Sequence, residues 1–566
     1  MTDTAARRKA RGAFFTPQPI SDFMVDWAVR SATDAVLEPA CGEAVFMEAA
    51  ARRLSDLGAE ASEMQISGMD IHRPSARTAR DRLRDRGVKV RVGVGDFLAS
   101  RPAPTVDAVI GNPPYIRFHD FSGPARTIAI EAALRQGVRL SKLASSWAAF
   151  VVHGAAYLRP GGRLAFVLPA ELLAANYASD VRRFLLERFS SVHLILFEEQ
   201  VFPGVMTETV LLLCEGDGGT DHFTVRQLRS AADLEHPPRS LMYRPEAISD
   251  KWTGALLSGR AGPRALGELV DTSAFVRLAD WGHVALGTVT GNNSYFALSP
   301  QRARELDLEP GELLRISPPG SHHLRGIRLT PSGLSHLGRA GQQTLLFRPS
   351  SVPSRAARSY IRLGERQGVH EAYKCRTRNP WWQVPLVPVA DLLVTCMNAD
   401  TPRLSVNEAR ARHLNSVHGL YLHRDHRDLA PALAVASLNS ATLLGAELVG
   451  RAYGGGILKL EPGEALGLPL PSVGTVRATA GELTALTPTL RKLIANGLLL
   501  DAVGLVDDIV LERRSGLSHE DVVTLREARS HMAERRVSRG GRPAGSARGR
   551  PAGSARGRPA GSARGR

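Results

Sequence analysis

Asp107-Ala-Val-Ile-Gly111 followed by Asn112-Pro113-Pro114-Tyr115 predicts a buried parallel strand that stops abruptly at a rigid turn. Open α/β sheets bind their ligands at the carboxyl ends of their strands. Because two prolines fix the turn, Asn112 presents its amide carbonyl and Pro113 its main-chain carbonyl as a rigid pair of acceptors. Such a pair suits an exocyclic NH2 group, and Tyr115 adds a flat face for stacking a ring. An ordinary Asn-Pro-Pro turn is the alternative interpretation.

Three earlier segments of the chain favour the ligand-binding interpretation. Val36-Leu-Glu-Pro-Ala-Cys-Gly-Glu-Ala-Val-Phe46 predicts a strand, a loop of small residues and a helix start, which lets a ligand approach the backbone. Ile66-Ser-Gly-Met-Asp70 ends in a carboxylate that can accept from ribose hydroxyls. Val90-Arg-Val-Gly-Val-Gly-Asp-Phe97 ends in an acid and an aromatic that can hold an adenine by hydrogen bond and edge contact. Asp70 and Asp96 could also cap helices, but the order of the segments predicts one crevice lined by Glu38, Asp70, Asp96 and Asn112.

The rest of this region predicts an α/β fold with a Rossmann-like sheet of about seven strands. Thr16 and Pro17 begin a helix whose apolar residues recur at helical spacing, and this helix can close the crevice with Thr16. Further along we expect a polar loop over 116–143, a helix over 147–158, a strand over 163–168 and a helix over 171–189. Two more strands end near Cys214.

These motifs, in this order, resemble the gamma class of DNA adenine-N6 methyltransferases of type II restriction–modification systems. The resemblance covers residues 11–475, and its most specific part is the combination of Glu-Pro-Ala-Cys-Gly42 with Asn-Pro-Pro-Tyr115. It implies a site-specific enzyme that moves a methyl group from S-adenosylmethionine to N6 of a flipped-out adenine in double-stranded DNA. The general look of the chain is similar to modification methylases of the SalI and XhoI type, which implies a hexameric target with a central TCGA.

The resemblance also assigns roles to individual residues. Asn112 and the Pro113 carbonyl would grip the adenine N6, and Phe202 would sandwich the flipped base against Tyr115. The residues that would contact S-adenosylmethionine are Thr16, Ala40, Asp70, Ile71, Asp96 and Pro114, beside Glu38 and Phe97 of the crevice. Ala44 departs from the family, which more often has a second glycine there. Since alanine is small, we expect a slightly tighter loop rather than loss of the cofactor.

The net charge of +16 is concentrated at the end of the chain. Residues 535–566 hold ten arginines and no acid, in a Gly-Arg-Pro-Ala-Gly-Ser-Ala-Arg repeat that predicts a disordered tail. Parts of the repeat resemble the AT-hook core that binds the minor groove, with alanine in place of the leading proline. A solvated tail without a DNA role is the alternative.

A composition change at Gly216-Asp-Gly-Gly219 indicates a second domain. We expect a catalytic domain over 1–220, a DNA target-recognition domain over 221–475, a C-terminal helical segment over 476–534 and the tail over 535–566. Three segments resemble parts of recognition domains in this family: Thr290–Phe296, Tyr373–Trp382 and Arg451–Leu458.

Several arginines of the second domain are candidates for contacts with phosphates or guanine edges, although any one of them could be an ordinary surface residue. They are Arg355, Arg358, Arg362, Arg376 and Arg378.

Composition narrows the partners and the compartment. Four widely spaced cysteines without a Cys-x-x-Cys pair predict a reduced, cytoplasmic protein with no zinc site, and we expect no other metal. The resemblance to restriction–modification enzymes implies a bacterial, DNA-associated protein. We see no uncharged apolar run of about eighteen residues, which would predict a membrane span, and no signal peptide. We expect a monomer that works beside a separate restriction endonuclease, since the chain lacks a nuclease signature. Two alternatives stay open: a methyltransferase acting on RNA or a protein amide, and a non-catalytic DNA-binding module.

Overall fold

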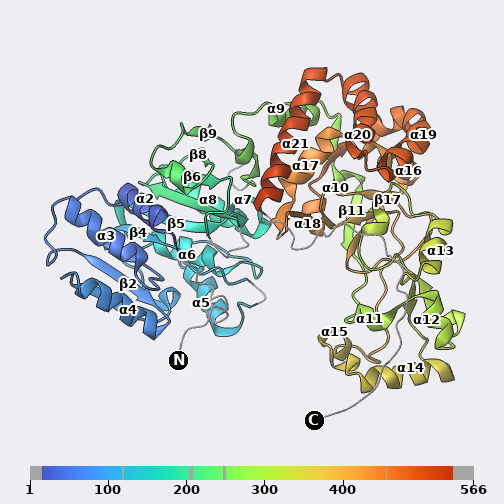
Figure 1. Cartoon of the computed structure of the whole chain (residues 1–566), viewed down its shortest axis with the longest axis horizontal. Coiled ribbons are helices and arrows are strands. Elements are labelled where there is room, and N and C mark those ends of the chain that lie inside the picture. The colour runs from blue at the N-terminus through green and yellow to red at the C-terminus, as the bar shows by residue number, and fades with distance from the viewer. Residues whose placement is uncertain (1–15, 118–119, 203–207, 246–249, 454, 540–566) are drawn as a thin grey trace, which may run out of the picture.

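A nine-stranded mixed sheet forms the centre of the first of two lobes (Figure 1). The computed structural model describes residues 16–117, 120–202, 208–245, 250–453 and 455–539. In spatial order the strands are β3 (Val90–Val94), β2 (Ile66–Asp70), β1 (Val36–Glu38), β4 (Val106–Gly111), β5 (Leu158–Pro169), β7 (Thr209–Glu215), β6 (Ser191–Phe197), β8 (Phe223–Leu228) and β9 (Leu241–Tyr243). The first five run parallel, whereas β7 is antiparallel to both of its neighbours. The carboxyl ends of β3, β2, β1 and β4 therefore meet at one edge of the sheet.

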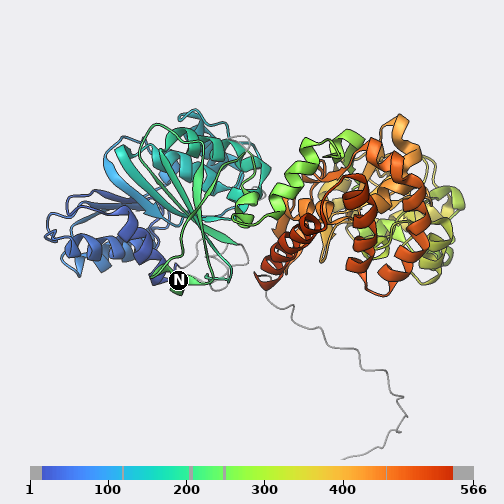
Figure 2. The ribbon, with the colours of Figure 1, turned by 90° about the horizontal axis from the view of Figure 1, so that it is seen from above.

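Helices cover both faces of this sheet, as Figure 2 shows from above. One face packs against α2 (Gln18–Ala28), α3 (Val45–Asp56) and α4 (Arg73–Arg84). The other face packs against α5 (Gly123–Leu134), α6 (Ser146–Ala155) and α8 (Ser179–Arg188), with the short α7 (Glu171–Ala174) nearby. Because both faces are buried, the central strands are almost continuously apolar, as in Leu164–Leu168.

The sheet differs from the expected one in its extent. It has nine strands rather than about seven, because β8 pairs parallel with β6 and β9 pairs antiparallel with β8. The sheet thus continues past residue 220 to Tyr243.

Two local predictions were also wrong. The expected loop over 116–143 contains α5, because Ala129, Ala132 and Ala133 bury a small-residue face against the rest of the lobe. The single helix expected over 171–189 is interrupted between α7 and α8, where Ala175 has an extended backbone with ψ of 135°.

The second lobe is built from small antiparallel sheets and helices. Its sheets are β10 (Phe275–Arg277) with β21 (Pro469–Pro471); β11 (Gly282–Leu286), β18 (Val417–Leu422), β15 (Leu392–Thr395) and β17 (Leu404–Val406); β12 (Ala297–Leu298), β14 (Leu345–Phe347) and β13 (Leu313–Arg315); and β16 (Met397–Asn398), β20 (Ile457–Lys459) and β19 (Arg451–Tyr453). Its helices are α9 (Gly262–Asp271), α10 (Leu278–Trp281), α11 (Asn293–Phe296), α12 (Pro300–Glu305), α13 (Pro331–Arg339), α14 (Arg355–Arg366), α15 (Tyr373–Arg376), α16 (Ala430–Ala436), α17 (Ser440–Val449), α18 (Pro462–Ala465), α19 (Val473–Ala495), α20 (Leu499–Asp507) and α21 (His519–Arg539). Within the described ranges no single helix has the length and apolar character to cross a membrane, although the bent pair Arg424–Ala436 and Ser440–Val449 passes on length and composition.

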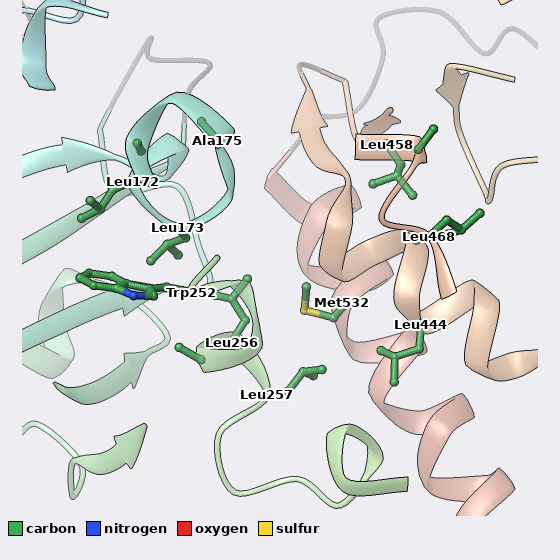
Figure 3. Packing of buried hydrophobic residues seen from close by; sticks show 14 of the residues in the cluster. Leu172, Leu173, Ala175, Trp252, Leu256, Leu257, Leu444, Leu458, Leu468 and Met532 are labelled. Atoms are coloured by element: carbon green, nitrogen blue, oxygen red, sulfur yellow. The ribbon is translucent and has the colours of Figure 1, made fainter. Parts of the chain in front are cut away.

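The two lobes share one apolar cluster at their junction (Figure 3). Leu173 and Trp252 lie on the side of the first lobe, and Leu444 and Met532 face them from α17 and α21. The main-chain N–H of Trp252 donates to the Leu173 carbonyl at 2.9 Å, which ties the segment between the lobes to α7. The lobes are therefore packed against each other through a core rather than joined by a bare linker.

Helix α21 makes polar contacts with the first lobe and with other helices of the second lobe. Arg535 donates to Glu208 of the first lobe at 3.4 Å, and Arg536 forms a bidentate pair with Glu447 of α17. Gly262 of α9 lies so close that an added Cβ would come within 2.5 Å of the Ala528 Cβ. The expected tail boundary at residue 535 was therefore wrong, since residues 535–539 are helical and Arg535 and Arg536 are buried. The remainder of the predicted tail, 540–566, lies outside the described residues.

Candidate active site

Four loops meet where β3, β2, β1 and β4 end, and hydrogen bonds link them. The Gly42 N–H donates to Asp70 Oδ2 at 2.8 Å, which joins the loop after β1 to the end of β2. The Gly95 N–H donates to the Asp70 carbonyl at 3.0 Å, which joins the loop after β3. Asn112 Nδ2 donates to Thr16 Oγ1 at 3.1 Å, which joins the loop after β4 to the start of α2. The structure thus brings Thr16, Asp70, Asp96 and Asn112 to one edge of the sheet.

The loop after β1 has the backbone geometry of a close-approach loop. Gly42 and Ala44 both adopt the left-handed region, with φ of 48° and 71°. A left-handed conformation favours glycine, so the structure gives a physical reason why glycine would suit position 44 better than alanine. Ala40 in the same loop is half-buried.

Glu38 is buried beneath this loop rather than open to it. Only 4% of its surface is exposed, and Oε2 accepts from the Met47 N–H at the start of α3 at 3.1 Å. Burial raises the pKa of Glu38 well above its usual value, against the lowering effect of the Met47 hydrogen bond. The side chain therefore holds the amino end of α3 in place.

Asp70 and Ile71 form the polar and apolar sides of the next position. Asp70 Oδ1 accepts from the His72 N–H at 2.7 Å while Oδ2 accepts from Gly42, so both oxygens have fixed directions. Ile71 leaves 68% of its surface exposed. The pair offers an apolar contact beside a hydrogen-bond acceptor.

Asp96 and Phe97 divide between surface and core. Asp96 is half-buried, and its Oδ1 accepts from the Leu98 N–H at 3.0 Å. Phe97 is 3% exposed and stacks against Phe150 and Tyr157 at centroid distances of 5.6 and 5.2 Å. The Phe97 ring therefore packs in the aromatic cluster next to α6 and is not exposed in the crevice.

The Asn-Pro-Pro-Tyr turn is held by hydrogen bonds at both of its ends, Asn112 and Tyr115. Asn112 Oδ1 is buried and has no hydrogen-bond partner, whereas its Nδ2 is bound to Thr16. The Tyr115 hydroxyl donates to the Val167 carbonyl of β5 at 2.9 Å, and burial raises its pKa well above the usual value. Pro113 is buried and Pro114 is half-buried. A buried carbonyl without a hydrogen-bond partner costs free energy, and Asn112 Oδ1 keeps its capacity to accept a hydrogen bond.

Ser146, the first residue of α6, was missed by the sequence analysis. Its hydroxyl accepts from the Ile116 N–H at 2.9 Å and donates to the Pro114 carbonyl. These two contacts clamp the backbone on either side of Tyr115. The available signal was the Ser145-Ser146 pair immediately before an apolar helix, where serines often satisfy free backbone groups.

Phe202 lies in the apolar cluster formed with α2 and α3, with 2% of its surface exposed. Tyr115 packs against the other apolar cluster of the lobe. The structure therefore does not open Phe202 to the crevice, and the residues directly after it, 203–207, lie outside the described ranges.

The predicted recognition arginines separate into two kinds. Arg355, Arg358 and Arg362 are exposed on α14, and Arg376 is exposed on α15. Arg378 instead donates to the carbonyls of Thr290 and Val289 at 2.7 and 2.5 Å, so it joins two segments of the lobe. The third predicted segment, Arg451–Leu458, contributes β19 and the start of β20, and its Gly454 lies outside the described residues.

Comparisons with known proteins match both lobes. Residues 1–225 match the N-6 DNA Methylase family model, and residues 249–511 match the model for the C-terminal domain of the type II methyltransferase M.Eco57I. The type II methyltransferase M.AccI of Acinetobacter calcoaceticus is 25% identical, over 81% of this chain and 84% of its own length. The type II methyltransferase M.XamI of Xanthomonas campestris pv. amaranthicola is 27% identical, over 83% and 87%. Among solved structures, the type IIL restriction-modification enzyme MmeI in complex with DNA shares the fold with a TM-score of 0.57 at 12% identity, covering 91% of this chain and 75% of that one.

Proposed function

Because this chain is a DNA adenine-N6 methyltransferase related to type II modification enzymes, we infer that Asn112 and Pro113 hold the acceptor amino group. The observation that carries this proposal is the Asn112 amide. Its Nδ2 is bound to Thr16, which leaves the buried Oδ1 as an acceptor in a fixed direction. An adenine N6 group has two hydrogens to donate, and the Pro113 carbonyl supplies the second acceptor.

The chemistry at N6 follows from those two acceptors. The lone pair of this nitrogen is delocalised into the adenine ring, so the group is a poor nucleophile. Two acceptors in tetrahedral directions favour a pyramidal nitrogen, whose lone pair then points toward the methyl donor. The residues act by positioning and electrostatics, and no strong base is required before attack. Ser146 supports this geometry by clamping the Pro114 carbonyl and the Ile116 N–H.

The crevice residues fit S-adenosylmethionine, which supplies a sulfonium methyl group already activated for transfer. In this proposal Asp70 accepts from the ribose hydroxyls, and exposed Ile71 covers one face of the adenine. Asp96 accepts from the adenine amino group, and Thr16, Ala40 and Pro114 complete the contacts. Glu38 acts through the start of α3, and Phe97 acts through the packing beneath the loop.

The target base must leave the duplex before it can reach the turn. Flipping costs a few kcal/mol, and stacking on an aromatic is worth ~1–3 kcal/mol per base. Tyr115 is fixed at its hydroxyl by Val167, which orients the ring for stacking. For Phe202 to form the other side of a sandwich, its ring must leave the apolar cluster in which it lies.

We propose the following division of labour for the complete chain. The first lobe, which includes β8 and β9, transfers the methyl group, the part of 221–475 beyond Tyr243 reads the target, and 476–534 supports it. The enzyme works as a monomer in the cytoplasm and protects DNA from a separate restriction endonuclease. The hexameric target with a central TCGA stays a prediction from the resemblance.

Methyl transfer from labelled S-adenosylmethionine tests the proposed function. We expect label in duplex DNA as N6-methyladenine at one sequence, and none in RNA or protein. Label in RNA or protein alone would contradict the proposal in favour of another acceptor, and cofactor binding without transfer would favour a non-catalytic module. Sequencing of methylated adenines in an expression strain identifies the target.

Asp70→Ala is expected to weaken S-adenosylmethionine binding by about 1.5–3 kcal/mol, because a charged acceptor for the ribose hydroxyls is lost. Isothermal titration calorimetry measures the effect. Asp85→Ala is the matched control, since Asp85 is exposed at the end of α4 and carries the same charge. Equal affinities for the two variants would contradict the assignment of the crevice.

Deletion of 540–566 is expected to lower the affinity for all DNA sequences equally and to leave the methylated sequence unchanged. The deleted segment carries seven arginines and no acid. The log–log salt dependence of binding becomes shallower by ~0.9 for each phosphate that the protein no longer neutralises. Footprinting and methylation mapping measure both effects, and a full-length variant with serines in place of the seven arginines separates charge from length. A changed target sequence would show that the tail takes part in recognition.

A further inference from the structure

Helix α14 presents a row of arginines along one exposed face. Arg355, Arg358, Arg362 and Arg366 are exposed, at spacings of three and four residues. The opposite face buries Ala357, Tyr360, Ile361 and Gly364. At ~1.5 Å per residue the row is about 17 Å long.

No carboxylate neutralises this row among the residues that the structure describes. The ion pairs there include none with any of the four arginines. Some exposed arginines on other helices are instead paired along the helix, as in Arg264 with Glu268. Glu365, the acid within α14, accepts from Trp381 Nε1 at 3.2 Å. The row therefore keeps its positive charge for a partner outside the chain.

The helix that carries the row is held rigidly from behind. The Tyr360 ring stacks on Tyr295 at 4.5 Å with an interplanar angle of 4°, and each hydroxyl donates to the carbonyl of the other residue. At Gly364 an added Cβ would come within 2.8 Å of the rings of Tyr295 and Trp381. The segments 290–296 and 373–382 thus form the platform under α14.

The start of α14 is fixed as well. Ser354 Oγ accepts from the Ala357 N–H at 3.0 Å and donates to Glu312 Oε2 at 3.0 Å, while the Ser354 N–H donates to Glu312 Oε1 at 2.9 Å. A fixed helix needs little ordering when it binds, so its charges can be placed without a large entropic cost.

We propose that α14 lies against the DNA duplex and that its arginine row binds the phosphate backbone. This inference rests on the proposed function, because the acceptor must be duplex DNA. Duplex DNA carries one negative charge per ~1.7 Å of axis, which matches an unneutralised row of guanidinium groups. A helix fits into the major groove of DNA, which is ~12 Å wide, and the arginine row of such a helix can face the phosphates at the edge of the groove. Lys374 and Arg376 extend the same charge onto α15.

The double variant Arg355→Gln with Arg362→Gln tests the proposal. Binding to a 30-base-pair duplex that contains the target is measured by fluorescence anisotropy over a salt series. We expect the log–log slope to become shallower by ~1.8, at ~0.9 per phosphate, and affinity at about 0.1 M salt to fall roughly 60-fold. The methylated sequence should stay the same.

Two further variants make the result specific. Arg513→Gln with Arg514→Gln removes the same charge from exposed residues of the same lobe, near α19 and α20 at the end opposite α14 (Figure 1). We expect this control to bind DNA as the wild type does. Arg355→Lys with Arg362→Lys keeps the charge and should restore most of the affinity.

The possible outcomes separate this inference from the proposed function. An unchanged slope in the α14 variant, or an equal loss in the control, would overturn the role of α14 while DNA methylation stands. A changed target sequence would overturn the backbone assignment in favour of base reading. Absence of methyl transfer to DNA by the wild type would instead overturn the proposed function.

Discussion

Asn112→Ala is expected to lower kcat for DNA methylation by a factor on the order of 10²–10³, the usual effect of removing one preorganised hydrogen-bond partner from an active site. The alanine removes the buried acceptor that we propose for the base, whereas the proposed cofactor contacts belong to other residues. Affinity for S-adenosylmethionine should therefore change little. Single-turnover methylation of duplex DNA and calorimetric titration of the cofactor measure the two effects.

The control for this experiment is Asn496→Ala, which removes the same side chain at an exposed position after α19. It should retain wild-type turnover. Near-normal turnover by Asn112→Ala would place the methyl acceptor elsewhere. An equal loss of cofactor affinity and turnover would instead mean that the whole crevice had been disturbed.

Arg536→Ala is expected to lower the free energy of unfolding by about 3–5 kcal/mol, because it leaves a buried carboxylate without its partner. The side chains of Arg536 and Glu447 are each 3% exposed, and two hydrogen bonds join them at 2.8 and 3.1 Å. Arg536 also donates to main-chain carbonyls of the second lobe, so these lose a donor as well. Urea unfolding measures the change.

Two comparisons make this prediction specific. Arg536→Met combined with Glu447→Leu removes both charges, and it should be less destabilising than the single variant. Arg513→Ala breaks an exposed pair with Glu482 and should have little effect. Wild-type stability of Arg536→Ala would mean that the buried pair does not hold α21 to α17.

The edge of the sheet that carries the candidate site could be anticipated because strand ends are local features. A short apolar run followed by a small residue or proline defines the end of a parallel strand, and consecutive ends meet at one edge. The pairing of β6 with β8 is a different matter. It depends on a contact between residues about thirty positions apart, at the far edge of the sheet, with no local signal for the partner.

Side-chain exposure was the least predictable property. Phe97 and Phe202 are placed among apolar residues of helices far away in the chain, and neither motif records those neighbours. Arg378 is next to a segment rich in exposed charges, yet its guanidinium group donates hydrogen bonds to the main-chain carbonyls of Val289 and Thr290. The local sequence shows where charged residues are. Tertiary packing decides whether such a residue is free to bind a partner or is bound to main-chain carbonyls of its own chain.

The boundary of the basic tail shows the same limit. The segment after Glu534 contains arginines and no acid, and therefore resembles a solvated segment. Arg535 pairs with Glu208, and Arg536 pairs with Glu447. Both glutamates are distant in the chain and come close to the arginines only in the folded molecule. The charge of the local sequence therefore predicted that the tail begins at residue 535, although α21 continues to Arg539.

The position of α21 has a consequence for the order of events during synthesis. The strands of the first lobe are complete once Tyr243 has left the ribosome, whereas the contacts of Arg535 and Arg536 must wait for almost 300 further residues. At about 5–20 residues per second, this interval lasts roughly 15–60 s. During that time Leu173 and Leu256, which later lie against α17 and α21, lack their partners and expose apolar surface to the cell. We therefore expect chaperones to bind the nascent chain at this apolar surface. The rate of translation through residues 244–539 sets how long the surface stays exposed.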